Sequence, residues 1–435
     1  MNVMLRYLIV LCVVLLPIST KVFVTSLVPE LYEYAREFSS LFLYGIDVVV
    51  IIMMGVFILR RRSFAYIQNS TSALLVLFIT SILISLGYVR NVEYSLFVGV
   101  HSIVAIIMAY IIASSLTEKI ISPRVIYIAI GISAVIQGLI ACAQFYYQRS
   151  IGLWMLGEST ITPLTTGIAR VDIGGVRFLR AYGTLPHANI LASFLVMGII
   201  SLAYIYLTTS KEERKTRLVS LVGIFITMVA LVLTFSRSGW LVGLFSLGII
   251  VGYGLWKKEL RHATARFMCT LIISGVAILF ILWWAIMPRA GFSKEEASVN
   301  HRLIYNRIGL TLIEHYPQGV GIGNQVLRGA EEGLYQKETL TQPWLWQPVH
   351  NIYILIASEL GVVGLLLFIA LLFSAMRMIS IHDTHGMWAL FLVLSQLTMG
   401  LVDHFPWDLH AGRLMFWVSF GVLMGLVARF QYKSL

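Results

Sequence analysis

Three stretches in the second half of the chain place basic side chains beside long apolar runs. Arg237 lies in LTFSRSGWLVGL, Arg302 lies in NHRLIYNRIGL, and His350 lies in WQPVHNIYILIASELG. An arginine so close to hydrocarbon is costly, and such residues usually face a cavity or a ligand. Guanidinium stays protonated and grips phosphate oxygens with two donors, whereas imidazole can accept a proton near neutral pH. These residue types predict an anion-binding site that contains a general base.

Each of these residues also has a structural interpretation, which its type alone leaves open. Arg237 would serve equally well by snorkelling to the lipid headgroups or by pairing with a carboxylate. A lone histidine at a membrane boundary, such as His350, is more often a hydrogen-bonded structural residue than a base. The small residues Ser236, Ser238 and Gly239 favour a ligand beside Arg237, because they let it approach the backbone closely.

Arg307 lies five residues after Arg302 on a helix predicted over 302–315. Two side chains at this spacing point in different directions, so at most one of them is expected to share a site with Arg237. The Gly-rich turn at 319–323 follows. No strand precedes this turn and no Gly-Lys-Ser/Thr follows it, so it is predicted to be a tight backbone turn rather than a nucleotide-binding loop.

Further polar residues lie where the chain returns to apolar sequence. Arg180 and His187 belong to RFLRAYGTLPHANILASF, Asn351 directly follows His350, and Asp403 begins DHFPWDLHAGRLMFW. The histidines and carboxylates of this last stretch would suit a metal ion, but they lack the i, i+4 histidine pair of a helical zinc motif. The sequence therefore predicts a site without a metal.

The elements that would position these side chains are membrane helices. Hydrophobic residues make up 58% of the 435 positions and charged residues only 12%, whereas soluble domains carry roughly 25% charged residues. The apolar runs are long enough for helices to cross hydrocarbon, which takes about 20 residues each. The predicted fold is an all-α polytopic membrane protein with about twelve transmembrane helices. These helices are predicted at 7–27, 41–59, 72–89, 95–115, 125–147, 188–208, 217–234, 239–256, 267–287, 351–374, 386–402 and 411–429.

Short loops rich in Lys and Arg alternate with loops of different composition. The basic set includes Arg60–Arg62, KEERKTR at 211–217 and WKKELRHATAR at 256–266. By the positive-inside rule these loops face the cytoplasm, and the even number of helices places both termini there. The distribution of the basic residues over these loops accounts for the net charge of +11, so no nucleic-acid partner is predicted.

Two loops on the opposite side are long, 148–187 and 288–350, and rich in Gly, Pro, Trp and Tyr. Loops of this length usually bind something or are disordered, and neither has the composition of disorder. We predict a single membrane domain over 1–435 with an elaborated outer face, including small helices at 30–38 and 325–337. The N-terminal run lacks a clear cleavage site and is interpreted as the first membrane helix rather than a signal peptide.

In this order and on this topology, FSRSGW, P-x-G-V-G-x-G-N and HN-x-Y…E-x-G-x-x-G resemble the O-antigen ligase family. Its relatives include Wzy-type polymerases and protein O-oligosaccharyltransferases. The resemblance covers Arg177 to Trp417, whereas the first five helices match only in number and hydrophobicity. It implies a C-type membrane glycosyltransferase of the bacterial inner membrane. Its active site would face the periplasm and use neither a cofactor nor a metal.

The resemblance also implies a reaction and roles for individual residues. A glycan would pass, with inversion, from undecaprenyl pyrophosphate to a sugar hydroxyl of the lipid A core. His350 would be the base, and Arg237 and Arg302 would hold the diphosphate. Arg302 is preferred because Tyr305 stands where relatives often carry tryptophan, with Arg307 as the alternative for this role. Other contacts to substrate would come from Arg180, His187, Arg307, Asn351 and Asp403.

Other functions remain open at this point. A Wzy-type polymerase would use a second carrier-linked repeat as acceptor, and a protein O-oligosaccharyltransferase would use a pilin or another secreted protein. Members that modify proteins are often longer, so a chain that stops at Leu435 is expected to be a ligase. A lipid-linked sugar transporter would place charged groups near the midplane, often in repeated halves, whereas the candidate groups here cluster at one face.

Overall fold

Each predicted membrane span contains a helix in the computed structural model, which describes residues 1–27, 40–60, 70–165, 167–290 and 297–434. The helix predicted at 30–38 lies outside these residues. The bundle helices are α1 (Asn2–Leu15), α4 (Gly45–Arg60), α5 (Ser70–Ser85), α6 (Val92–Thr117), α7 (Pro123–Tyr147), α8 (Ala188–Thr208), α9 (Arg214–Leu233), α10 (Arg237–Trp256), α11 (Arg261–Ala290), α15 (Ile352–Met376), α16 (Thr384–Gly400) and α17 (His410–Ser434).

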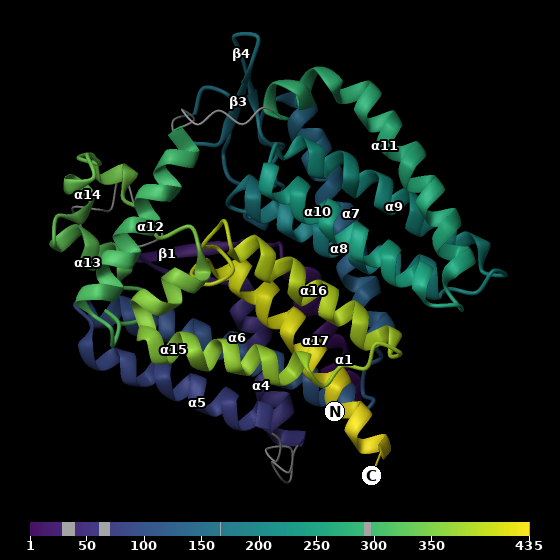
Figure 1. Ribbon diagram of the computed structural model, residues 1–435, viewed down its shortest axis with the longest axis horizontal. Coiled ribbons are helices and arrows are strands. Elements are labelled where there is room, and N and C mark those ends of the chain that lie inside the picture. Colours follow the sequence, from purple (N-terminus) through teal and green to yellow (C-terminus); the bar gives the residue numbers. More distant parts are fainter. Residues whose placement is uncertain (28–39, 61–69, 166, 291–296, 435) are drawn as a thin grey trace.

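The helix lengths confirm an all-α polytopic membrane protein. Nine of the described helices are long and apolar enough to cross a membrane. The other three predicted spans correspond to shorter helices, because α1, α4 and α16 have 14, 16 and 17 residues. The two chain ends lie at the same end of the molecule, away from the small helices of the large loop (Figure 1).

The N-terminal segment corrects one prediction. The helix predicted over 7–27 ends at Leu15, and Lys21–Ser26 instead forms strand β1, which pairs antiparallel with β2 (Ser40–Tyr44). Pro17 follows the end of the helix and has no amide hydrogen to continue its ladder. The β-branched and aromatic residues of KVFVTS favour a strand. The next helix accordingly begins at Gly45 rather than at 41.

Helices α8 and α17 form the centre of the bundle. The most apolar stretch of α8 is fully buried, and that of α17 is 94% buried, whereas α11 lies at the outside with 11%. Helix α17 packs closely on α6 because Gly421 and Gly425 present no side chain there. A Cβ atom at these positions would lie 2.6 Å from the Ala109 carbonyl oxygen and 2.7 Å from that of Ala113. Small residues four apart allow this close approach of two membrane helices.

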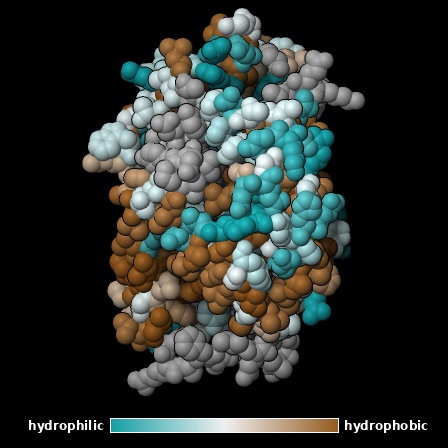
Figure 2. Space-filling view, turned by 90° about the vertical axis from the view of Figure 1, so that its left-hand side faces the viewer, coloured by the Kyte–Doolittle hydropathy of each residue, from teal (hydrophilic) through white to brown (hydrophobic). Residues whose placement is uncertain are grey.

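The two long loops fold over one end of the bundle. The loop at 148–187 contains the hairpin of β3 (Arg170–Ile173) and β4 (Val176–Leu179), which the sequence did not predict. The other long loop contains α12 (Ala297–His315), α13 (Gln325–Glu331) and α14 (Leu334–Lys337). Seen from the end that carries α12–α14, hydrophilic residues gather across the middle of this face, above and beside strongly hydrophobic surface (Figure 2).

The helices predicted in the large loop are largely confirmed. The helix predicted over 302–315 is α12, which begins five residues earlier and ends at His315 as expected. The helix predicted over 325–337 is split into α13 and α14. Gly333 separates the two with a φ of 66°, a left-handed conformation that interrupts an α-helix.

Candidate active site

One cavity of about 500 Å³ collects most of the predicted site residues. Four arginines and three histidines line it, from segments far apart in the sequence. They are Arg180, His187, Arg237, Arg289, His301, Arg302 and His350. Among the described residues that line the cavity there is no Asp or Glu, so its wall is strongly cationic. Such a cavity favours an anionic ligand that accepts several charge-assisted hydrogen bonds.

Arg237 is the first residue of α10 and reaches the cavity because the chain breaks sharply between α9 and α10. Phe235 adopts a left-handed φ of 49° in this break. Ser236 then caps α10, with its hydroxyl accepting the Gly239 amide hydrogen at 3.2 Å. The N-terminus of a helix carries partial positive charge, which adds to the charge of the guanidinium. Arg289, at the end of α11, donates from Nε to the Phe235 carbonyl oxygen at 3.5 Å.

His350 stands immediately before α15 and is held by contacts on both sides. The Asn351 side chain caps α15 by accepting the amide hydrogens of Tyr353 and Ile354. The His350 ring stacks on Tyr305 of α12, with ring centroids 5.3 Å apart. Its Nδ1 lies 2.9 Å from the Pro348 carbonyl oxygen. A carbonyl oxygen can only accept, so Nδ1 carries the hydrogen and Nε2 of the neutral ring keeps its lone pair.

The surroundings of His350 also keep the ring neutral. Burial is the main cause that lowers the pKa of His350 to about 3, and His404 and Arg302 lower it further. Asp403 acts in the opposite direction. At neutral pH the imidazole is therefore unprotonated and able to accept a proton through Nε2.

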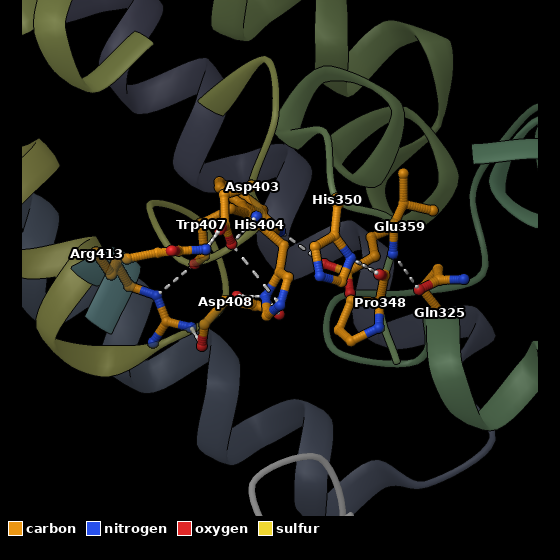
Figure 3. Close-up of polar contacts among 11 residues, drawn as sticks. Gln325, Pro348, His350, Glu359, Asp403, His404, Trp407, Asp408 and Arg413 are labelled. Atoms are coloured by element: carbon orange, nitrogen blue, oxygen red, sulfur yellow. Dashed lines mark hydrogen bonds and ion pairs between the residues drawn. The ribbon is translucent and has the colours of Figure 1, made fainter. Parts of the chain in front are cut away.

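A buried polar network supports His350 from the loop between α16 and α17. The His404 ring lies edge-on to His350 at a centroid distance of 4.6 Å, and its Nδ1 donates to the Asp408 carboxylate at 2.8 Å (Figure 3). Arg413 fixes this loop by donating to the carbonyl oxygens of Trp407 and Asp408 at 2.9 and 2.8 Å. The loop is thus bonded along its length and holds His404 in one orientation.

Asp403 joins this network to the first turn of α8. Burial alone would raise the pKa of Asp403, but His404, His350 and Arg302 together lower it below its ordinary value, so Asp403 stays ionised. One of its oxygens accepts the Asn189 amide at 2.8 Å. The other accepts the backbone amide of His404 at 2.9 Å.

Arg180 and His187 line the cavity from the segment just before α8. Arg180 is buried and donates to the Thr234 carbonyl oxygen and to the Asn189 side chain, both at 2.7 Å. Burial lowers the pKa of Arg180 to about 10, which still leaves it protonated at neutral pH. His187 caps α8 by accepting the Asn189 amide hydrogen at Nδ1. Burial lowers the pKa of His187 to about 3, so its Nε2 carries a hydrogen and can donate.

The Gly-rich turn binds backbone rather than a ligand, as predicted from its sequence. Its Val320 and Gly321 amides donate to the carbonyl oxygens of Ser358 and Glu359, where α15 is kinked at Gly361. Gly361 has a φ of 74°, and a Cβ there would lie 2.5 Å from the carbonyl carbon of Gln318. The turn and the kink therefore fit together only without side chains, and they link α12 to α15.

Three predicted site residues do not line the cavity. Arg307 points away from it and pairs with Glu338 at 2.6 Å, with 62% of its side chain exposed. Geometry on α12 thus separates Arg302 from Arg307, as their spacing predicted. The Asn351 side chain caps α15 and donates a hydrogen bond to the Leu401 carbonyl oxygen at 3.1 Å. Asp403 does not line the cavity; it accepts hydrogen bonds from Asn189 and His404 and raises the pKa of His350.

Sequence reasoning did not single out Arg289 or His301, which also line the cavity. Arg289 offered the same signal as Arg237, a cation at the end of an apolar helix. The histidines and carboxylates include one group that could hold a metal, because donor atoms of His350, Asp403 and His404 lie within 4.8 Å of one another. Both Asp403 oxygens already accept hydrogen bonds, and cationic Arg302 faces the group, so the surroundings favour protons over a metal cation.

Comparison with known protein families gives a match for the part of the chain that carries much of this cavity. Residues 222–369 match the family model described as O-antigen ligase. This stretch runs from α9 to α15 and contains Arg237, Arg289, Arg302 and His350. No curated protein matches the chain. Members of the matched family are glycosyltransferase-like enzymes of the ligase and polymerase types. Residues 222–369 of the protein therefore match the O-antigen ligase family, the family that its motifs resemble.

Proposed function

We propose that this protein is an O-antigen ligase. It transfers a glycan from undecaprenyl pyrophosphate to a sugar hydroxyl of the lipid A core, on the periplasmic face of the bacterial inner membrane. The observation that carries the proposal is the cavity wall, which offers four guanidinium groups and, among its described residues, no carboxylate. A diphosphate is the group in this reaction that requires such a site.

The arginines act on the leaving group. As the bond between the anomeric carbon and the diphosphate oxygen breaks, its electron pair stays with the diphosphate. The departing anion is stable, so it needs positive charge rather than a proton from a general acid. Arg237 and Arg302 hold the diphosphate oxygens, and fixed donors aimed at developing charge commonly contribute about 3–4 kcal/mol each. Arg180 and Arg289 also line the cavity and add to its positive electrostatic potential.

His350 acts on the acceptor. The acceptor hydroxyl forms the new bond to the anomeric carbon from the face opposite to the diphosphate, which inverts that centre in a single displacement. Its proton passes to Nε2 of His350, the nitrogen that the Pro348 contact leaves with a lone pair. The charge of the bound diphosphate counters the effect of Arg302 on His350 and makes the imidazole a stronger base in the complex. Base catalysis of this kind contributes roughly 10²–10⁴-fold.

Apolar residues on the rim suit a lipid-linked donor. Leu241 of α10 and Leu401 after α16 both line the cavity, and they are 58% and 52% exposed. On membrane helices such exposed apolar side chains face lipid. The polyprenyl chain can therefore remain in the bilayer beside α10 and α16 while its diphosphate enters the cavity.

A reconstituted assay with three acceptors tests the proposal. Purified protein in vesicles receives carrier-linked glycan together with lipid A core, a second carrier-linked repeat and a pilin. We expect label on the lipid A core. Label on the carrier-linked repeat would make the protein a polymerase, and label on the pilin would make it a protein O-oligosaccharyltransferase. Movement of intact carrier-linked glycan across the membrane, with no transfer, would make it a transporter.

A further inference from the structure

A second buried cluster of polar side chains lies apart from the cationic cavity, where α4, α6 and α17 meet. Asp47 comes from the first turn of α4, His101 from α6, and His410 is the first residue of α17. His101 Nε2 lies 3.0 Å from one oxygen of Asp47, and His410 Nε2 lies 3.2 Å from the other. The donor atoms of the three residues all lie within 4.8 Å of one another.

His101 is held between a backbone carbonyl and the Asp47 carboxylate. His101 Nδ1 lies 2.7 Å from the Phe97 carbonyl oxygen, so Nδ1 carries the hydrogen. Its Nε2 is directed at the Asp47 carboxylate, 3.0 Å from one oxygen. Metal-binding histidines typically donate their second nitrogen to a backbone carbonyl in this way.

His410 provides the second, independent observation. Only 8% of this residue is exposed, and neither ring nitrogen has a partner with hydrogen-bond geometry among the described residues. Its ring is fixed by stacking on Tyr44, with centroids 3.9 Å apart and planes 12° from parallel. A buried imidazole without hydrogen bonds is costly, because burial removes the water that would otherwise satisfy it. The Nε2 atom is aimed at the same carboxylate as His101.

We propose that Asp47, His101 and His410 bind one divalent transition-metal ion of the zinc class. Two imidazoles and one carboxylate form a donor set that zinc commonly takes. The separations of 3.0 and 3.2 Å approach the roughly 3.3 Å between donors at the corners of a tetrahedral zinc site. A small adjoining cavity of about 40 Å³, lined by His101 and His410, has room for a water molecule as fourth ligand.

Two cations, Lys21 and Arg413, also line the small cavity. Arg413 directs its guanidinium to the Trp407 and Asp408 carbonyl oxygens. The Lys21 ammonium lies over the Phe42 ring, 4.4 Å from its centroid. Asp408, which also lines the small cavity, adds negative charge.

The metal would tie the N-terminal part of the chain to the loop that carries His404 and Asp408. His410 follows this loop directly, and Asp47 and His101 belong to two of the first helices. The ion therefore has a structural role, and its presence does not depend on which glycan acceptor the protein uses.

Zinc binding to the full-length protein tests this inference. The protein is purified through a tag without histidines, loaded with zinc, passed over a desalting column and analysed for bound metal. We expect about one zinc per chain, and less than about a tenth of that in Asp47→Asn and His410→Gln. Zinc should raise the Tm of the wild type and leave the Tm of these variants unchanged. Loading with Co²⁺ should give the visible absorption of a tetrahedral site.

Two controls separate this site from other histidines. His262→Gln, at an exposed position of α11, should retain zinc. His404→Gln removes a member of the other group of candidate ligands and should also retain zinc. Loss of zinc in His404→Gln alone would place the ion near His350 and overturn the assignment. A folded wild-type protein that retains no zinc would also overturn the assignment.

Discussion

The state of His350 leads to a quantitative prediction for the pH dependence of transfer. His350 accepts a proton only while its Nε2 is unprotonated. Its pKa is lowered to about 3 in the free protein, chiefly by burial, so the base stays available until the pH falls towards that value. A solvated histidine with a pKa of about 6.5 would be only about 9% neutral at pH 5.5.

The ratio kcat/KM reports ionisations of the free enzyme and the free substrate. The donor diphosphate is esterified at both ends and stays ionised across this range. We therefore expect kcat/KM at pH 5.5 to lie within about twofold of its value at pH 7.5, whereas a solvated histidine would cause a loss of about tenfold. At saturating donor the inflection of kcat should lie at higher pH, because the bound diphosphate favours the imidazolium.

The assay measures initial rates in vesicles at subsaturating carrier-linked glycan, with labelled acceptor. His350→Ala serves as the reference, because any pH dependence that persists in it arises from another group. An inflection of kcat/KM near pH 6.5 that disappears in His350→Ala would refute the reasoning. It would mean that water reaches the imidazole and that neither burial nor Arg302 controls its protonation.

Three substitutions test the remaining assignments. His350→Ala should lower kcat by roughly 10²–10⁴-fold with an unchanged Tm, and near-normal transfer would exclude it as the base. Arg302→Lys keeps the charge but loses the two-donor grip, so the rate of transfer should fall by roughly 10²-fold. Arg307→Lys, outside the cavity, is the matched control. A larger loss of transfer in Arg307→Lys than in Arg302→Lys would reverse the roles of the two arginines. Gly361→Ala should lower the free energy of unfolding by about 1–3 kcal/mol through backbone conformation alone, and more through its clash with Gln318. Denaturation of the purified variant measures this, and an unchanged stability would show that α15 can straighten.

Much of the fold could be predicted because membrane helices are encoded locally. An apolar run of sufficient length forms a helix in lipid whatever its neighbours are, since no water is present to satisfy the backbone. Hence α8, predicted at 188–208, has those bounds in the structure. The failure at 7–27 has a local cause as well, because an apolar strand such as β1 cannot be distinguished from a continuing helix by hydropathy alone.

The candidate site was predictable in its residue types and only partly in its geometry. Arg237 and His350 were found because a polar residue at the end of an apolar run is a signal within a few residues of sequence. Arg289 carries the same signal, but nothing in the sequence places the end of α11 beside Phe235. The role of Asp403, behind His350 rather than in the cavity wall, was equally inaccessible, since it depends on contacts between residues more than two hundred positions apart.

The sequence by itself determined that the chain has many membrane-spanning helices, and it predicted that arginine and histidine beside apolar runs form the site. Those properties depend on run lengths and residue types. Only the tertiary structure decided that Arg302 enters the cavity while Arg307 pairs with Glu338, and that His350 keeps its lone pair on Nε2. The rotation of a helix and the tautomer of a histidine are fixed by the packing and hydrogen bonds of distant segments, which short-range sequence patterns do not encode.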